Sequence, residues 1–356
     1  MNVLRYEALP MHVIFGAGAI TELAAEADRL QLRKVLVLCT PEQRELGERV
    51  AGLLGDRAGG VFAGARMHVP TQAVREAESA FAEAGADGCV VAGGGSTIGL
   101  GKALALRHDL PIIALPTTYA GSEMTPIWGL TEAERKVTGR DRRVLPRSVV
   151  YDPELTYGLP VTVTVNSGLN AMAHAIEALY APDSSPVVAA MAEQGLREFL
   201  WALPILKEQP AHLEARAGAL RGAWLCGACL GATTMGLHHK LCHVLGGSLN
   251  LPHAETHAAL LPHVVAFNLP FAPRAGEVLA RAMGLSSPDE VAVKFRLLVD
   301  ELSWGRTLSD LGMSHGDIDG IVDEVLRSPY SNPREPGRDD LIRILEASLG
   351  HPSRSR

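Results

Sequence analysis

The sequence predicts an α/β first domain, built on a parallel sheet with flanking helices, followed by an all-helical second domain. Up to about residue 150, short apolar runs alternate with amphipathic stretches, which is typical of parallel strands joined by crossover helices. After about Pro153, apolar residues recur only at helical spacing. A chain of 356 residues is long enough for two domains, and we place them at residues 1–155 and 156–356.

Six apolar runs predict the strands of the sheet, and they cover residues 12–16, 34–39, 60–64, 88–92, 110–115 and 149–152. Amphipathic stretches predict helices between them at residues 20–30, 41–54 and 71–84, and a further helix that runs through 102–107. In the second domain we predict helices at residues 166–180, 186–201, 212–234, 289–302, 317–326 and 338–349. Asn166 or Ser167 can cap the first of these.

The composition is that of an ordinary globular enzyme. Hydrophobic residues make up 47% of the chain, and the net charge of -7 argues against a nucleic-acid-binding protein, whose surface would be basic. Because neither a secretory segment nor an uninterrupted run of about 20 apolar residues is evident, we expect a cytoplasmic protein. Cys226 and Cys229 could form a metal or redox pair, but without a second pair we favour packing.

A glycine-rich loop, Gly93-Gly94-Gly95-Ser96, directly follows the strand predicted at 88–92 and opens a helix. Glycines let a ligand approach the backbone closely, and exposed N–H groups at the start of a helix favour an anion. The alternative is a tight turn, but three successive glycines exceed what a turn needs. The loop does not have the common GxGxxG spacing, so we interpret it as a phosphate-binding loop of another kind.

Hydroxyl groups and glycines also follow other predicted strands, where α/β sheets bind ligands. Thr40 stands where an acidic residue usually holds the adenosine ribose of a dinucleotide. Because threonine does not repel the 2′-phosphate of NADP, we expect weak discrimination between NADH and NADPH. The predicted cofactor-binding residues are Gly16, Gly18, Thr40, Gly93, Gly94, Gly95, Ser96, Thr97, Thr117, Thr118 and Ser122.

Six of the 13 histidines lie between His238 and His263. His239 and His243 are four residues apart, so on a helix they share one face, and Asn170 and His174 have the same spacing. His174, His239 and His253 could supply three imidazoles to iron, zinc or nickel, with the neutral amide of Asn170 as a weak fourth ligand. A metal-free polar pocket is the alternative. His238, His257 and His263 are better explained as structural.

These stretches together carry a family resemblance. They are Gly93–Lys102, Pro116–Glu123, Asn170–Glu177, His238–Gly247, Leu251–His257 and Leu261–His263. On these motifs the sequence resembles the iron-containing (group III) alcohol dehydrogenases, and within that family it is similar to the maleylacetate reductases. The resemblance covers nearly the whole chain. It implies a dinucleotide-binding domain, a helical domain, an active site in the cleft between them, and a homodimer.

The resemblance also bears on the metal. In the metal-dependent members an aspartate and three histidines bind the ion, at positions that correspond here to Asn170, His174, His239 and His253. The aspartate is replaced by Asn170, and Gly99 stands where the family usually has a second aspartate. Both departures resemble maleylacetate reductases, so we expect no required metal.

The activity that the resemblance implies is reduction of the carbon–carbon double bond of maleylacetate to 3-oxoadipate by NADH or NADPH, in the degradation of aromatic compounds. We expect His243 to act as general acid or polarising donor, and cations to bind the two carboxylates. The predicted catalytic residues are His243, His253, His174, His239, Lys240, Tyr119, Arg142 and Lys136, with Arg143 as a further cation. The charged run at 136–147 could instead be a solvated loop. The alternative functions are a metal-dependent alcohol dehydrogenase or carbonyl reductase of the same fold, and a non-enzymatic nucleotide-binding protein.

Overall fold

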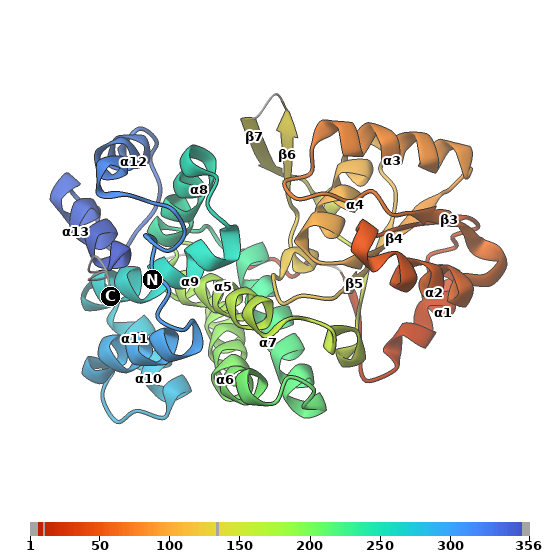
Figure 1. Ribbon diagram of the computed structural model, residues 1–356. Coiled ribbons are helices and arrows are strands. Elements are labelled where there is room, and N and C mark those ends of the chain that lie inside the picture. The colour runs from red at the N-terminus through yellow and green to blue at the C-terminus, as the bar shows by residue number, and fades with distance from the viewer. Residues whose placement is uncertain (1–5, 10, 133–134, 351–356) are drawn as a thin grey trace, which may run out of the picture. The chain divides into compact units, whose positions relative to one another are not determined.

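A computed structural model describes residues 6–9, 11–132 and 135–350 of the chain (Figure 1). The chain divides into two compact units. One extends from Ala8 to Leu159, and we call it the first unit. The second unit comprises the chain from Pro160 onward together with the residues before Ala8.

The first unit is built on a six-stranded sheet in the order β1-β8-β5-β4-β2-β3, with every neighbouring pair parallel. Its strands are β1 His12–Phe15, β2 Val35–Leu38, β3 Ala58–Phe62, β4 Gly88–Gly93, β5 Ile112–Pro116 and β8 Ser148–Tyr151. Its helices are α1 Leu23–Arg29, α2 Arg44–Leu54, α3 Thr71–Glu83 and α4 Gly95–His108. The predicted parallel sheet with crossover helices is therefore confirmed.

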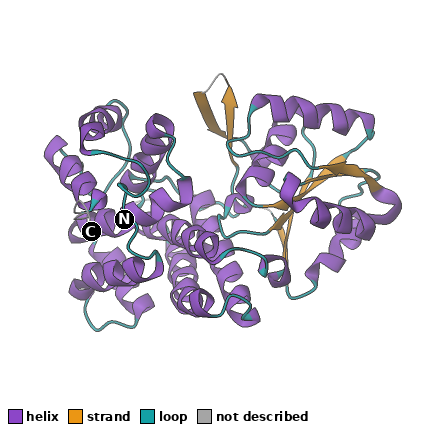
Figure 2. Ribbon diagram, viewed as in Figure 1, coloured by secondary structure: helices purple, strands orange, loops and turns teal. Residues whose placement is uncertain are grey.

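Helices cover both faces of this sheet (Figure 2). Alternate residues of the strands, such as Val35, Val90 and Ile113, form one core cluster with α1 and α2. The helices α3 and α4 contact each other, and α4 contacts β4 and β5. Close packing of α4 needs a glycine, because a Cβ at Gly101 would overlap Val91 Cγ1. The strands β2, β4, β5 and β8 are fully buried, which explains why they read as continuous apolar runs.

A two-stranded antiparallel hairpin, β6 Ile127–Glu132 and β7 Arg135–Arg140, follows β5 in the sequence. Our alternative of a solvated loop at 136–147 is wrong for its first part, which lies in β7. A short 3-10 helix, Arg142–Val144, comes next. Because arginine and lysine dominate β7, the period-2 apolar pattern that would have predicted the strand is absent.

The second unit contains helices and, among its described residues, no strand. They are α5 Val161–Tyr180, α6 Pro186–Glu208, α7 Leu213–Ala232, α8 Leu237–Leu249, α9 His253–Asn268, α10 Pro273–Met283, α11 Val291–Leu302, α12 Ile318–Leu326 and α13 Arg338–Leu349. None of the described helices is long and apolar enough to cross a membrane. Cys226 and Cys229 are buried, unbridged residues of α7, which confirms that they pack in the core.

The predicted cap of the first helix is wrong. The helix α5 begins at Val161, so Asn166 and Ser167 lie inside it. Ser167 Oγ donates to the carbonyl of Val163 at 2.6 Å instead of capping a helix start. The β-branched run at 161–165 lowers helix propensity, but burial of most of α5 from Thr164 onward stabilises the helix over that preference.

Candidate active site

The glycine-rich loop lies where the sheet topology places ligands. After β2 the chain continues to β3 on one side, and after β4 it continues to β5 on the other side. Adjacent strands whose connections diverge in this way create a crevice at their carboxyl ends. Gly93 and Gly94 lie at the end of β4 in this crevice, and α4 begins at Gly95 with its N–H groups directed outward.

The three glycines differ in what surrounds them. A Cβ at Gly93 would overlap Thr97 Oγ1 and lie 2.8 Å from Gln43 Oε1. A Cβ at Gly94 would lie 2.9 Å from Thr118 Cγ2. A Cβ at Gly95 would meet nothing within 4 Å, and this residue is exposed. The first two glycines are therefore required by the protein itself, whereas Gly95 leaves open space beside the start of α4.

Other predicted cofactor-binding residues gather beside this loop. Thr117 Oγ1 accepts a hydrogen bond from Gln43 Nε2 at 2.9 Å. Thr40 precedes the short 3-10 helix Pro41–Gln43 at the end of β2. The Glu42 N–H and the Thr40 hydroxyl lower the pKa of the Glu42 carboxyl by hydrogen bonding. The Glu42 carboxylate thus lies two residues after Thr40, which occupies the position where an acidic residue usually binds the adenosine ribose.

Gly16 and Gly18 lie elsewhere in the sheet. They follow β1, which β8 and β5 separate from β4. The N–H of Gly18 donates to Asp152 Oδ1 at 3.2 Å, and the N–H of Ile20 donates to Asp152 Oδ2 at 3.1 Å. This turn is therefore satisfied by a carboxylate of its own unit, and the structure does not bring it to the glycine-rich loop.

The Pro116–Glu123 stretch ends in a buried ionisable group to which the sequence motif assigned no role. Glu123 is fully buried, and its Oε1 accepts a hydrogen bond from the Tyr151 hydroxyl at 2.8 Å. Burial raises the pKa of Glu123 to about 7. Lys102 Nζ donates to the carbonyl oxygens of Ser122, Thr125 and Ile127 within 2.8 Å. Burial lowers the pKa of Lys102 to about 7.

The remaining predicted residues of the first unit have varied surroundings. Tyr119 is fully buried. Arg142 is exposed, and Arg143 Nη2 donates to Asp141 Oδ2 at 2.7 Å. Lys136 lies in β7, and its side chain is outside the described part of the structure.

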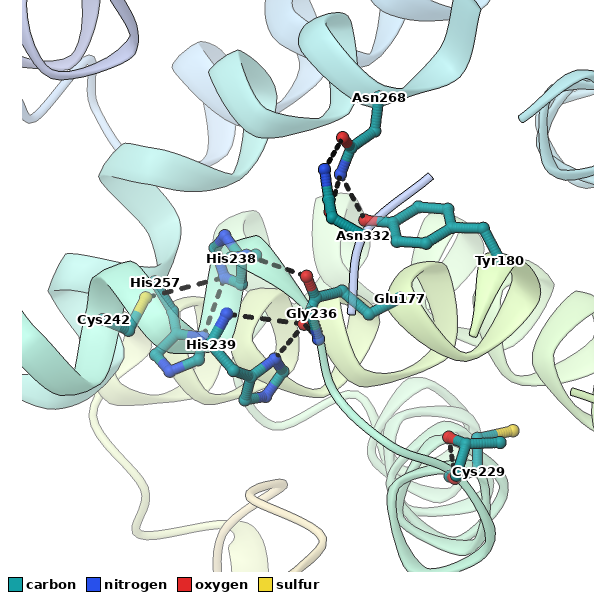
Figure 3. Close-up of polar contacts among 11 residues, drawn as sticks. Glu177, Tyr180, Cys229, Gly236, His238, His239, Cys242, His257, Asn268 and Asn332 are labelled. Atoms are coloured by element: carbon teal, nitrogen blue, oxygen red, sulfur yellow. Dashed lines mark hydrogen bonds and ion pairs between the residues drawn. The ribbon is translucent and has the colours of Figure 1, made fainter. Parts of the chain in front are cut away.

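In the second unit, α5, α8 and α9 bring six histidines together. Three of them, His238, His239 and His257, are drawn in Figure 3. We call this the histidine cluster, and its members are His174, His238, His239, His243, His253 and His257. Its rings form a continuous series, with centroids 5.0 Å apart for His174 and His239 and 4.5 Å apart for His253 and His257. His243 and His253 stack at 6.2 Å and are exposed, so they form the accessible edge of the cluster.

The four other members are buried. Burial is the main cause that lowers the pKa of His174 and His257 well below the usual range, and that of His238 to about 3. These three rings are therefore neutral at physiological pH. His238 Nε2 and His257 Nδ1 lie 2.9 Å apart and share a hydrogen bond, which supports the prediction that both are structural.

Glu177 anchors the cluster, and the sequence reasoning did not single it out. It lies in α5, one turn after His174, with 1% of its surface exposed. Glu177 Oε2 is 2.6 Å from His239 Nδ1 and accepts the N–H of Gly236 at 2.9 Å, while Oε1 accepts the N–H of His238 at 2.8 Å (Figure 3). The signal in the sequence was its spacing from His174, but the partners at 236–239 are distant along the chain.

Comparison with known proteins establishes the family. Residues 10–153 match the family described as iron-containing alcohol dehydrogenase, and residues 164–349 match its C-terminal domain. The chain belongs to the iron-containing alcohol dehydrogenase family. It is therefore an oxidoreductase, and it is 54% identical to a maleylacetate reductase of Burkholderia cepacia over 97% of both chains. The crystal structure of maleylacetate reductase from Agrobacterium tumefaciens has a TM-score of 0.93 and 46% identity, covering 98% of this chain and 99% of that one.

The family description raises the question of iron. The residues at the expected ligand positions offer an amide oxygen and three imidazoles, none of which carries a negative charge. Asn170 Oδ1, His174 Nδ1 and His239 Nε2 are buried without a hydrogen-bond partner among the described residues, so they suit a water or a polar ligand. His253 is exposed. Without an anionic ligand, this set does not fit a resident iron ion.

A second set of buried side chains lies close enough together to be considered as a metal site. Among the described residues, one group of at least three His, Cys, Asp or Glu side chains has all its ligand atoms within 4.8 Å of one another. It consists of His238, Cys242 and His257. Here the two imidazoles already bond each other, and burial raises the pKa of the Cys242 thiol well above its usual range. A metal bound here would have to displace both the thiol proton and the hydrogen bond between the two imidazoles.

Proposed function

We propose that this chain reduces the carbon–carbon double bond of maleylacetate to 3-oxoadipate with NADH or NADPH. The observation that carries the proposal is the 54% identity to the Burkholderia cepacia maleylacetate reductase over 97% of both chains. A second relative, the maleylacetate reductase of Pseudomonas sp. (strain P51), is 49% identical over 99% of both chains. Such full-length similarity supports a shared reaction and not only a shared fold.

The glycine-rich loop and the first turn of α4 suit the diphosphate of the cofactor. Open space beside Gly95 and the outward N–H groups of the helix start provide room and hydrogen-bond donors for an anion. When bound, a reduced nicotinamide supplies the hydride that adds to the alkene carbon remote from the ketone.

The residues of this chain then have to manage a negative charge and a proton. Hydride addition places negative charge on the ketone oxygen as an enolate, and a proton must reach the carbon next to the ketone. His243 is the proposed general acid, because it lies at the exposed edge of the histidine cluster and stacks with His253. Lys240, half-buried one helical turn away on α8, is a proposed partner for a substrate carboxylate.

We further propose that the reaction needs no resident metal, because Asn170 is neutral where an anionic ligand would stand. The test is NADH oxidation with maleylacetate before and after exhaustive chelation, with metal analysis of the purified protein. We expect full activity after chelation. Loss of activity that iron or zinc restores would contradict the metal-free proposal and favour a metal-dependent dehydrogenase of the same fold. No turnover of any enone or carbonyl with either cofactor would contradict the enzymatic proposal itself.

The homodimer and the cytoplasmic location stay predictions. Light scattering on the purified chain measures its molar mass, and twice the monomer value would support the dimer. Fractionation of the producing cell tests the location.

A further inference from the structure

The carboxylate of Glu177 accepts four hydrogen bonds, three from backbone N–H groups and one from a side chain. The N–H groups of Gly236, His238 and His239 lie 2.9, 2.8 and 3.4 Å from its two oxygens. These N–H groups lie at the start of α8, where the helix itself offers them no acceptor. The helix dipole also favours a negative charge at this end. The fourth contact, from His239 Nδ1 at 2.6 Å, comes from a side chain of the proposed active site.

This contact settles where His239 carries its hydrogen. The backbone N–H groups of Gly236, His238 and His239 all donate toward the two oxygens of Glu177, so this side chain acts as an ionised acceptor. An ionised carboxylate only accepts hydrogen bonds, so His239 Nδ1 must be the donor. In a neutral imidazole the other nitrogen, Nε2, then presents a lone pair. That atom is buried and has no hydrogen-bond partner in the part of the chain that the structure describes.

We infer that Glu177 is a positioning residue that fixes His239 in its Nδ1–H tautomer, so that His239 Nε2 acts as a hydrogen-bond acceptor in the substrate pocket. The inference rests on the proposed function for its catalytic meaning. The other buried pair of the cluster differs, because His238 and His257 bond each other and not a carboxylate.

The fixed tautomer restricts which histidine of the cluster can donate a hydrogen bond and which can only accept one. A lone pair at His239 Nε2 repels a developing enolate oxygen, so His239 is excluded as the donor that stabilises it. The stabilising donor must come from another group, and His243 and His253 lie at the exposed edge. His239 instead suits an O–H group, such as a water that is held in line with the proton path.

The first test needs no substrate and no variant of Glu177. Nitrogen-15 NMR of histidine-labelled protein distinguishes the two tautomers, and His239→Gln identifies the His239 signals by their loss. We expect the hydrogen of His239 on Nδ1 in the natural chain. A hydrogen on Nε2, or a stoichiometric metal bound through Nε2 in the purified protein, would overturn the inference.

The second test compares Glu177→Gln with Asp340→Asn. Asp340 is a buried carboxylate of the same unit that accepts the N–H of Gly337 at the start of α13, so its amide variant matches the loss of a helix-start acceptor. An amide has one acceptor oxygen and cannot serve all four donors at Glu177. We expect both variants to lower the melting temperature. Only Glu177→Gln should shift the His239 tautomer and lower kcat, about 100-fold, with the KM for NADPH unchanged.

Equal kcat in the two variants, once both are measured well below their melting temperatures, would reduce Glu177 to a structural residue and overturn its positioning role. If Glu177→Gln does not fold, Glu177→Asp keeps an anionic acceptor and takes its place, with partial loss of kcat and an unchanged tautomer expected. If the enzyme does not reduce maleylacetate, the tautomer experiment still decides the inference independently of the proposed function.

Discussion

Replacing Gly95 by alanine separates cofactor binding from folding. A Cβ at this position meets no protein atom within 4 Å, so the fold has no steric reason to lose stability. Because glycine is a poor helix former, alanine in α4 should raise the free energy of unfolding by up to about 1 kcal/mol. The methyl group would instead occupy the space in which the diphosphate of the cofactor approaches the helix start. Loss of one hydrogen bond to a charged group removes about 1.5–3 kcal/mol of binding energy. The Kd for NADPH should therefore rise about 10- to 150-fold.

The assay is titration of NADPH fluorescence, with urea unfolding of the same preparations. Gly52→Ala is the matched control, because Gly52 lies in α2 and a Cβ there also meets nothing within 4 Å. It should gain similar stability and bind NADPH as the natural chain does. If Gly95→Ala is as stable as expected yet binds NADPH with the natural Kd, the cofactor diphosphate does not lie at the start of α4.

Three further predictions follow from the site residues. His243→Ala should lower turnover about 10²- to 10⁴-fold. NADPH affinity and melting temperature should change little, since His243 is exposed. The control His315→Ala should leave turnover unchanged, and near-natural turnover of His243→Ala would remove His243 from the mechanism. Thr40→Asp should raise the KM for NADPH more than that for NADH, and equal effects in steady-state kinetics would refute the placement of the ribose at the end of β2. Glu123→Gln should change the pH dependence of stability, because the folded state raises the pKa of Glu123 from 4.5 to about 7 and so binds a proton that the unfolded chain releases. The stabilising effect of the protonated carboxyl is complete below pH 4.5 and is lost as pH rises to about 7, so the unfolding free energy of the natural chain should fall relative to Glu123→Gln by about 3 kcal/mol between these limits. A difference that stays constant with pH in urea titrations would contradict this.

The sheet could be predicted from the sequence because most of its strands are buried on both faces. Continuous apolar runs such as Val35–Leu38 and Ile112–Pro116 are typical of buried strands in a parallel sheet. The hairpin at 127–140 was missed for the opposite reason. The residues of its strands whose burial is described are half-buried or exposed, and β7 contains three basic residues, so the period-2 pattern is weak.

In the helical unit, α8 and α9 were not predicted as helices, although the spacing of His239 and His243 suggested one. Their histidines and glycines interrupt the apolar period that identifies a helix. Glu177 illustrates what local patterns leave out. Its spacing from His174 predicts a shared helix face, but the contact with Gly236 and His239 depends on how α5 packs near the start of α8. Asn170 could be recognised from the sequence only because the family resemblance assigned a role to its position.

The foundation of the histidine cluster joins segments that are far apart along the chain. A side chain at Gly236 would lie 2.8 Å from the carbonyl of Ser331 and 3.4 Å from Asn332 Oδ1, and Asn332 in turn bonds Asn268 (Figure 3). When the stretch around Gly236 emerges from the ribosome, Ser331 and Asn332, which cover it, have therefore not yet been synthesised. Until Ser331 and Asn332 emerge, the start of α8 lacks part of its covering. Closing loops of this length is entropically slow, so the cluster should be among the last parts of its unit to become ordered during synthesis. A nascent chain that stops short of Ser331 therefore lacks part of the covering on which the cluster rests.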